Sequence, residues 1–296
     1  SPEVRVTPGS IKPEKEFEMP QRLKEKPATK NKAEDSDIYE RPSAKTWDGL
    51  SRMAFAANWD PETAINWNLP IELGKVREGW INILHYFYEG EWQGLEIIQR
   101  LMNKASHLFN IPEMVTYYST QCCDEAKHLF VFRKYLQKLN SPPSKEKVFD
   151  PLVWLATSGP MPVERWILGT YFTETMAGAI FQKTLELPAI DPTGKEMIRW
   201  QLKDESRHIA GTKLGVQTLM DHCGPLKTAF LKMWWKIFVK LAVKEVRALK
   251  PYGDQVGMDP EYILRKSFSK MAEMEEFKRK FLGSDLSQSF LTRSDA

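Results

Sequence analysis

The sequence predicts an all-α protein: a four-helix bundle with one long crossover connection and additional C-terminal helices. Three observations support this fold class. Long stretches without proline carry apolar residues at the three- and four-residue spacing of a helix. Prolines separate these stretches at the points where helices are expected to begin or end. The stretches follow the order hairpin, long crossover, hairpin, which is the connectivity of a bundle with one crossover.

The N-terminal residues 1–46 are rich in Pro, Lys and Glu and contain few apolar positions. Such a composition is typical of an extended or disordered segment. We therefore predict an N-terminal arm over residues 1–46 and one helical domain over residues 47–296, with order beginning near Trp47. Within that domain the bundle should span residues 71–222, and accessory helices should span residues 225–283.

The first helical hairpin is expected in the N-terminal half of the bundle. Residues 71–109 contain no proline and carry a helical apolar pattern, which predicts one long helix. Pro112 suits the first turn of a second helix, which should run to about Asn140. The short connection makes the two helices antiparallel neighbours. Residues 141–160 contain four prolines and should form the irregular crossover.

The second hairpin follows the crossover. One helix is expected at about residues 161–187, where Pro188 ends it, and its partner at about 193–222. Pro225 opens a further helix to Leu249, and another should cover about residues 259–282.

The composition limits the possible functions. The chain has 296 residues, of which 42% are hydrophobic and 11% aromatic, so it can bury a substantial core. A net charge of +3 is too small to indicate a nucleic-acid partner. Three cysteines form no disulfide framework and favour a reducing compartment. No apolar run approaches a membrane span, and no signal-peptide core is visible. We expect a cytoplasmic protein with no membrane span.

Two similar five-residue motifs contain the candidate metal ligands. Asp124-Glu125-Ala126-Lys127-His128 and Asp204-Glu205-Ser206-Arg207-His208 lie 80 residues apart. Glu and His three residues apart share one helix face, so both reach a single metal. An isolated Glu-X-X-His is most often a solvated face. Two copies, each preceded by Asp in a chain with only five His, favour a metal site instead.

A metal pair in a helical bundle needs two more carboxylates, one from each remaining helix. Glu91 lies 34 residues before Glu125, and Glu174 lies 31 residues before Glu205. Both are in the right place. Glu89 and Glu96 both stay open as alternatives to Glu91. Glu89 and Glu91 point about 200° apart around a helix, so only one of these two faces inward. The apolar residues that flank Glu91 at helical spacing favour Glu91.

On these residues the bundle, roughly residues 71–222, resembles the ferritin-like di-iron carboxylate superfamily. The Asp-Glu-X-Arg-His form is most similar to its O2-activating branch, which includes ribonucleotide reductase small subunits and bacterial multicomponent monooxygenase hydroxylases. The resemblance implies a ferritin-like fold in which Asp124 and Asp204 bond the ligand imidazoles. It implies these metal ligands: Glu91, Glu125, His128, Glu174, Glu205 and His208.

The resemblance also implies a function. Carboxylate-rich ligation suits iron or manganese, so two iron ions are expected, with manganese possible in one site. The protein should be a non-haem di-iron oxygenase or oxidase that uses O2 on a mostly apolar small organic substrate, by hydroxylation, desaturation or N-oxygenation. No flavin or nicotinamide motif is visible, so electrons should come from an external reductase or ferredoxin. A homodimer is expected.

Two alternatives stay open. The first is a radical generator similar to ribonucleotide reductase small subunits, although Phe132 occupies the position four residues after the first ligand His, where that family usually has a radical Tyr. The second is a ferroxidase or iron-binding protein. The aminoarene N-oxygenase branch has an extra ligand His four residues before the last Glu. Gln201 stands there, so a seventh ligand is not expected.

Small and apolar residues near the ligands are candidates for a substrate pocket, and ordinary core packing is the alternative for each. Thr170 is the hydroxyl best placed to face the site and is a candidate proton relay, with bonding to its own helix as the alternative. The pocket candidates are Gly94, Cys122, Leu129, Phe132, Ala177, Gly178, Phe181, Gln201 and Ile209.

Overall fold

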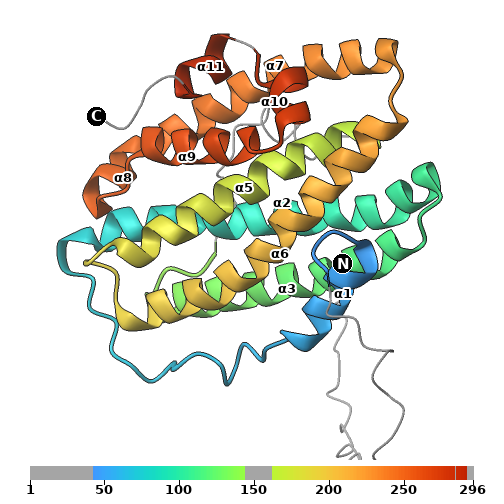
Figure 1. Cartoon of the computed structure of the whole chain (residues 1–296). Coiled ribbons are helices and arrows are strands. Elements are labelled where there is room, and N and C mark those ends of the chain that lie inside the picture. The colour runs from blue at the N-terminus through green and yellow to red at the C-terminus, as the bar shows by residue number, and fades with distance from the viewer. Residues whose placement is uncertain (1–42, 144–161, 284, 292–296) are drawn as a thin grey trace, which may run out of the picture. The chain divides into compact units, whose positions relative to one another are not determined.

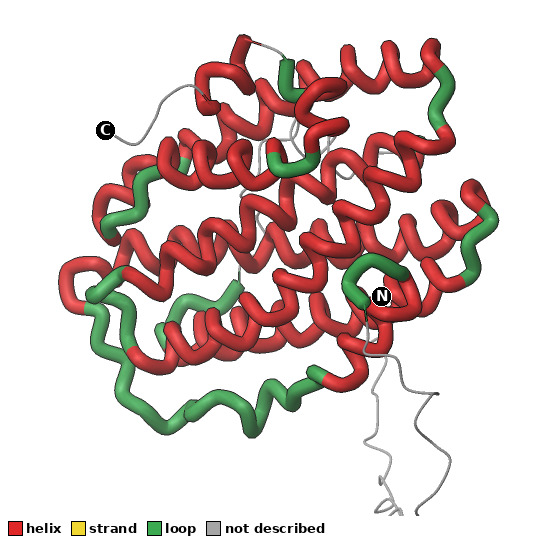
Figure 2. The backbone as a smooth tube through the Cα atoms, in the orientation of Figure 1, coloured by secondary structure: helices red, strands yellow, loops and turns green. Residues whose placement is uncertain are grey.

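The computed structural model describes residues 43–143, 162–283 and 285–291. All regular elements in these ranges are helices, which confirms the predicted all-α class (Figures 1 and 2). None of the helices described there combines the length and the hydropathy that a membrane span requires. Most of the predicted arm and most of the predicted crossover lie outside the described residues. The proposed division into an arm and a helical domain stays a prediction.

Four long helices form the bundle. Helix α2 (Arg77–Phe109) packs along α3 (Glu113–Lys138), and α5 (Val163–Glu186) packs along α6 (Pro192–His222). Contacts of α2 with α5 and of α3 with α6 join the two hairpins (Figure 1). This is the arrangement that the order hairpin, crossover, hairpin predicts.

Local signals explain where these helices begin and end. The Asp191 carboxylate accepts a hydrogen bond from the Gly194 amide and caps α6, whose first residue is Pro192. At the end of α2, Asn110 adopts a left-handed backbone conformation with φ of 55°, and its amide bonds the Ser106 carbonyl. The chain therefore turns sharply enough for α3 to begin three residues later.

Two predicted helices have different limits in the structure. The helix expected from Ile71 begins at Arg77, because Gly74 has a φ of 50° and the preceding segment closes in a 3-10 turn, η2 (Gly74–Val76). The continuous helix expected over 259–282 is split into two. Helix α9 (Pro260–Ala272) and helix α10 (Glu275–Phe281) are separated at Met274, whose backbone is extended.

Within the described residues, three α-helices were not predicted. These are α1 (Trp47–Ala56), α8 (Lys250–Val256) and α11 (Asp285–Leu291). Helix α1 begins where order was expected, because the Thr46 hydroxyl accepts from the Gly49 amide as an N-cap. The predicted helix after Pro225 is α7 (Pro225–Ala248).

Two apolar clusters fill the interior. One contains Tyr117 of α3 and Phe172 of α5, and the other contains Phe132 of α3 and Phe181 of α5. On each bundle helix, the predicted ligand positions lie between residues of the first cluster and residues of the second. The packing therefore places those polar residues midway along the bundle, between two apolar layers.

Candidate metal centre

The six predicted ligand residues come together in the middle of the bundle. Glu91 comes from α2 and Glu174 from α5, while α3 and α6 supply one Glu and one His each. Their exposed fractions are small: 8% for Glu91, 6% for Glu174, and 2% or less for Glu125, His128, Glu205 and His208. Acidic residues are seldom buried this deeply unless a cation or hydrogen-bond donor balances their charge.

The first group surrounds His128. Its Nδ1 atom lies 3.3 Å from Glu91 Oε2, 3.4 Å from Glu125 Oε2 and 3.6 Å from Glu205 Oε1. One nitrogen and three carboxylate oxygens thus face a common point. They lie within 4.8 Å of one another, as the ligand atoms of one metal ion would.

The second group surrounds His208. Its Nδ1 atom lies 3.3 Å from Glu125 Oε1, 3.4 Å from Glu174 Oε2 and 3.7 Å from Glu205 Oε2. Glu125 and Glu205 therefore each direct one oxygen towards each histidine. Two carboxylates are shared between the groups, and Glu91 and Glu174 each belong to one.

The two aspartates hold the imidazoles in a crossed arrangement. His128 Nε2 lies 3.3 Å from Asp204 Oδ2, and His208 Nε2 lies 3.3 Å from Asp124 Oδ2. Each Asp therefore contacts the histidine of the other motif: Asp204 contacts His128, and Asp124 contacts His208. With Nε2 donating to Asp, the Nδ1 lone pair points towards the glutamates, which is the tautomer that metal ligation requires.

Cations and a tryptophan surround the aspartates. Arg207 Nη2 lies 3.0 Å from Asp124 Oδ2 and 2.6 Å from Asp204 Oδ1. Lys127 Nζ lies 2.8 Å from Asp124 Oδ1, and Trp59 Nε1 donates to Asp204 Oδ2 at 2.7 Å. Sequence reasoning assigned no role at the site to these residues. Arg207 and Lys127 each stand next to a predicted ligand His, but the sequence does not show that both point inward.

The electrostatics show a surplus of negative charge among the ligand candidates. Burial raises the pKa of Glu91 to about 8, against the opposing effect of His128. Burial and then the charge of Glu174 raise the pKa of Glu205. Burial alone would lower the pKa of both histidines, but the surrounding carboxylates have the larger effect and raise the pKa of each. Without metal, bound protons therefore reduce the repulsion among these carboxylates.

The residues fit a pair of divalent metal ions. Two such ions carry the four positive charges that balance four glutamates. Glu205 Oε2 and His208 Nδ1 are buried and have no hydrogen-bond partner, which a metal–ligand bond would relieve. Four carboxylates with two imidazoles are the donor set of carboxylate-bridged iron or manganese pairs.

The choice between Glu91 and its neighbours on α2 follows from the same geometry. Glu91 joins the His128 group, whereas Glu89 accepts a hydrogen bond from Gln93 Nε2 at 3.4 Å. Glu96 accepts from Trp92 Nε1 at 3.1 Å, and Trp92 is 53% exposed. The carboxylate that the structure brings to the cluster is therefore Glu91.

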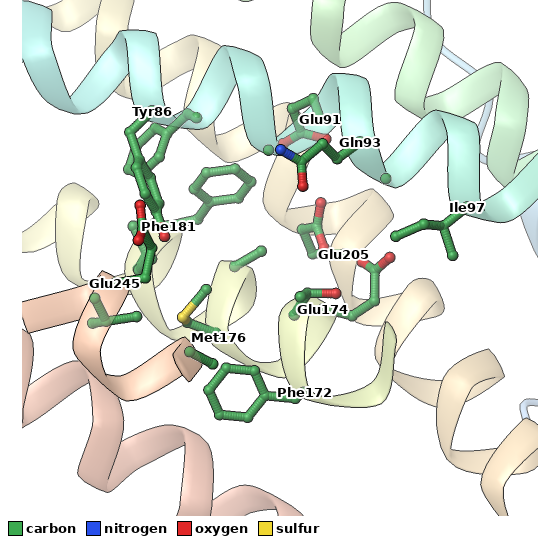
Figure 3. A pocket seen from close by; sticks show the side chains of 18 of the residues that line it. Tyr86, Glu91, Gln93, Ile97, Phe172, Glu174, Met176, Phe181, Glu205 and Glu245 are labelled. Atoms are coloured by element: carbon green, nitrogen blue, oxygen red, sulfur yellow. The ribbon is translucent and has the colours of Figure 1, made fainter. Parts of the chain in front are cut away.

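A pocket of about 120 Å³ opens beside these carboxylates, with walls from α2, α5 and α7 (Figure 3). Glu91, Glu125, Glu174 and Glu205 form its polar side. Most of the remaining wall is apolar, and it includes Phe87, Ile97, Phe172, Met176, Ala177, Ile180, Phe181, Phe238, Ala242 and Val246.

Three of the nine pocket candidates line this pocket: Gly94, Ala177 and Phe181. At Gly94 the nearest atom to an added Cβ is Glu125 Cδ at 3.9 Å, so this glycine leaves space beside a ligand candidate. At Gly178 an added Cβ would lie 2.8 Å from Ile209 Cδ1, so that glycine serves close packing of α5 on α6. The candidates that do not line the pocket are Cys122, Leu129, Phe132, Gly178, Gln201 and Ile209.

The Thr170 hydroxyl bonds to its own helix, which was the alternative to a proton relay. Its hydroxyl donates to the Trp166 carbonyl at 2.7 Å, along its own helix, and the residue does not line the pocket. The hydroxyl-bearing residue of α5 on the pocket wall is Thr173.

Sequence reasoning missed two features of the site. Gln121 Nε2 donates to Glu174 Oε1 at 3.0 Å, and its position four residues before Glu125 repeats that of Gln201 before Glu205. This repeated Gln was a usable signal. The second feature is the wall contributed by α7, including Glu245, for which the sequence gives no motif.

A family model described as P-aminobenzoate N-oxygenase AurF matches residues 83–284. The chain belongs to this family. Its membership confirms the predicted relationship to the di-iron ferritin-like superfamily, and it identifies an oxidoreductase of the O2-activating kind. Gln201 stands where an extra ligand His was expected for aminoarene N-oxygenases. The family model matches the chain nevertheless, so the absence of that His does not separate this chain from the family.

Solved structures share the fold. A Synechococcus protein with aldehyde deformylating oxidase activity is 17% identical, with a TM-score of 0.55 over 75% of this chain and 98% of that one. An R2-like ligand-binding oxidase variant with a Mn/Fe cofactor is 15% identical, with a TM-score of 0.59 over 79% and 93%. Another variant of that oxidase, with an Fe/Fe cofactor, gives the same values. No curated protein matches the chain.

Proposed function

We propose that this protein binds two iron ions and uses O2 to oxygenate a mostly apolar small organic substrate. The observation that carries the proposal is the apolar pocket, which opens directly onto the four glutamates of the two histidine groups. When bound, the metal pair would supply the electrons and the coordination positions for O2 reduction. The proposed ligands are Glu91, Glu125, His128, Glu174, Glu205 and His208.

The surrounding residues would fix the ligands in place. Glu125 and Glu205 would be shared by both metals, because each directs one oxygen towards each histidine. Asp124 and Asp204 would keep the imidazole protons on Nε2 and raise the basicity of Nδ1. The donor set suits manganese in one position as well as iron.

The pocket would hold the substrate and exclude water from the reacting atoms. Its volume of about 120 Å³ is close to the ~150 Å³ cavity that accommodates benzene in another protein. A substrate with one ring or a short chain therefore fits. Of hydroxylation, desaturation and N-oxygenation, we favour N-oxygenation of an amine, because the family model is named for that reaction.

The electrons that return the metal pair to its reduced state would come from a separate protein. The sequence carries no flavin or nicotinamide motif, so we propose a reductase or ferredoxin as the donor. We also propose that the protein acts in the cytoplasm as a homodimer. Dimerisation is testable by size-exclusion chromatography with light scattering on the full chain.

Metal loading with matched variants tests the function. The protein is incubated anaerobically with Fe(II), desalted and assayed for iron, and O2 uptake is then followed with and without one-ring aromatic amines. We expect two irons per wild-type chain and O2 uptake that amines accelerate. Glu125→Ala should lose at least one iron, because both groups share this carboxylate. Glu96→Ala, on the same bundle but outside the groups, should retain two. Wild-type protein without bound iron would contradict the proposal.

A further inference from the structure

Two buried glutamines occupy matching places before the two motifs. Gln121 lies four residues before Glu125, and Gln201 lies four residues before Glu205. Both side chains are fully buried, and four residues are about one helical turn, so each glutamine shares a helix face with the glutamate that follows it. From this repeat alone, the two glutamines would be expected to make the same contacts.

The structure gives them different contacts. Gln121 Nε2 lies 3.0 Å from Glu174 Oε1 and 3.4 Å from Glu125 Oε1. Gln201 Nε2 instead bonds the Met197 carbonyl of its own helix, at 3.5 Å. Within the part of the chain that the structure describes, α3 therefore supplies a side-chain amide to the carboxylates of the metal groups, and α6 supplies none.

The surrounding carboxylates determine how the Gln121 amide is oriented. Ionised carboxylate oxygens only accept hydrogen bonds, so the NH2 group rather than the oxygen of the amide faces Glu174 and Glu125. Gln121 Oε1 is buried and has no hydrogen-bond partner. Leaving a buried oxygen unpaired is unfavourable, so close packing alone does not explain an amide at this position. Its contact with the carboxylates does.

The two glutamates that belong to a single metal group are held differently. They approach the centre from α2 and α5 (Figure 3). Glu174 accepts from Gln121 through Oε1 and faces His208 through Oε2, at 3.4 Å. Glu91 faces His128 through Oε2, at 3.3 Å, and among the described residues no side-chain amide bonds either of its oxygens. Only Glu174 therefore has one oxygen held by an amide while the other faces a metal position.

The two groups also differ in how many donors are in place. Four residues of the His128 group hold ligand atoms within 4.8 Å of one another, but three do so in the other group: Glu125, Glu174 and His208. Glu205 Oε2 lies 3.7 Å from His208 Nδ1, the longest of the six carboxylate–imidazole distances in the two groups. A ligand binds more tightly where less of its site must rearrange. The position beside His128 is therefore the better formed of the two.

We propose that the two metal positions are unequal: the position beside His128 fills first, and the position beside His208 depends on Gln121, which positions Glu174. This inference rests on the proposed function, because it takes the two groups as one dinuclear metal centre. Gln121 would act through Glu174 and not as a ligand itself. Without the amide, Glu174 Oε1 would be unpaired in a buried site, and Oε2 would no longer be held towards His208.

Stepwise iron binding tests the proposal. Metal-free full-length protein is titrated anaerobically with Fe(II), and equilibrium dialysis gives the dissociation constant of each step. We expect wild-type protein to bind a first iron at least about tenfold more tightly than a second. His208→Ala should remove the weaker step and His128→Ala the tighter one, which assigns each step to a position.

Gln121→Met removes the amide but keeps a side chain of similar length. It should weaken the second step about 10–100-fold, the usual effect of losing a residue that orients a ligand, and leave the first step unchanged. Gln121→Ala, which also lacks the amide, should have the same effect. Gln201→Met is the matched control, because it makes the same substitution at an equally buried glutamine whose amide reaches no carboxylate. It should leave both steps unchanged.

Several results would overturn the inference. Two equal steps in wild-type protein would do so without any variant, and so would loss of the tighter step in His208→Ala. An effect of Gln121→Met on both steps or on neither, or an equal effect of Gln201→Met, would remove the role of Gln121. Wild-type protein that takes up two irons in equal steps and consumes O2 leaves the proposed function intact, whereas protein that holds fewer than two irons at saturating Fe(II) overturns both proposals.

Discussion

Replacing Asp204 by Asn tests the crossed pairing of aspartates and histidines. Asp204 accepts from His128 Nε2 at 3.3 Å, from Trp59 Nε1 at 2.7 Å and from Arg207 at 2.6 Å. The substitution keeps the size of the side chain but removes its charge. A hydrogen bond to a charged group contributes about 1.5–3 kcal/mol, and loss of an Asp that orients a ligand His typically weakens metal binding about 10–100-fold.

The assay is a competition titration of each variant with a chelator of known affinity for Mn(II) or Fe(II). Asp204→Asn should weaken metal binding about 10–100-fold, or about 1.4–2.7 kcal/mol, chiefly at the His128 group. Arg207 keeps Asp124 as a partner, so the fold should persist. A double-mutant cycle then identifies the coupled histidine.

In that cycle, the effect of Asp204→Asn should largely disappear once His128 has been replaced by Ala. The effect of Asp204→Asn should persist when His208 is replaced by Ala instead, although His208 belongs to the same motif as Asp204. Coupling to His208, or no change in metal affinity, would refute the crossed arrangement.

Three further predictions follow from the same geometry. Metal binding should release protons and tighten from about pH 6 to pH 8, because Glu91 has a pKa of about 8 in the metal-free fold; calorimetry in buffers of different ionisation enthalpy checks this. The metal-free protein should lose stability as pH rises from about 4.5 to 8, because the folded state then binds more protons than the unfolded state; urea unfolding across that range checks the sign. Gly94→Leu should fill the space beside Glu125 and weaken binding of one-ring amines at least about tenfold while two irons are retained, and Gly283→Ala is a neutral control.

The fold and the cluster of candidate ligands were accessible from the sequence because they depend on local periodicity. Helical spacing places Glu125 and His128 on one face, and proline positions mark the helix boundaries. Glu91 was favoured over Glu89 by the same periodicity, and the structure brings Glu91 to the His128 group. These features depend only on the angular positions of residues around a single helix, and the order of the residues determines those positions.

Other features depend on how helices pack, and local patterns do not show them. The pairing of Asp204 with His128 arises only when α3 and α6 lie side by side. Phe132 was a plausible pocket residue, yet it packs against Phe87 and Phe181 inside an apolar cluster. The pocket wall from α7 was missed because Glu245 looks like any other charge on an amphipathic helix until its neighbours are known.

An anomalous X-ray difference map, from crystals of the anaerobically iron-loaded protein measured at the iron edge, tests the central claim most directly. We predict two peaks inside the bundle, about 3.5–4 Å apart, one next to His128 Nδ1 and the other next to His208 Nδ1. A single peak, no peak, or peaks bound only by surface residues would contradict the assignment of these six side chains to one dinuclear centre.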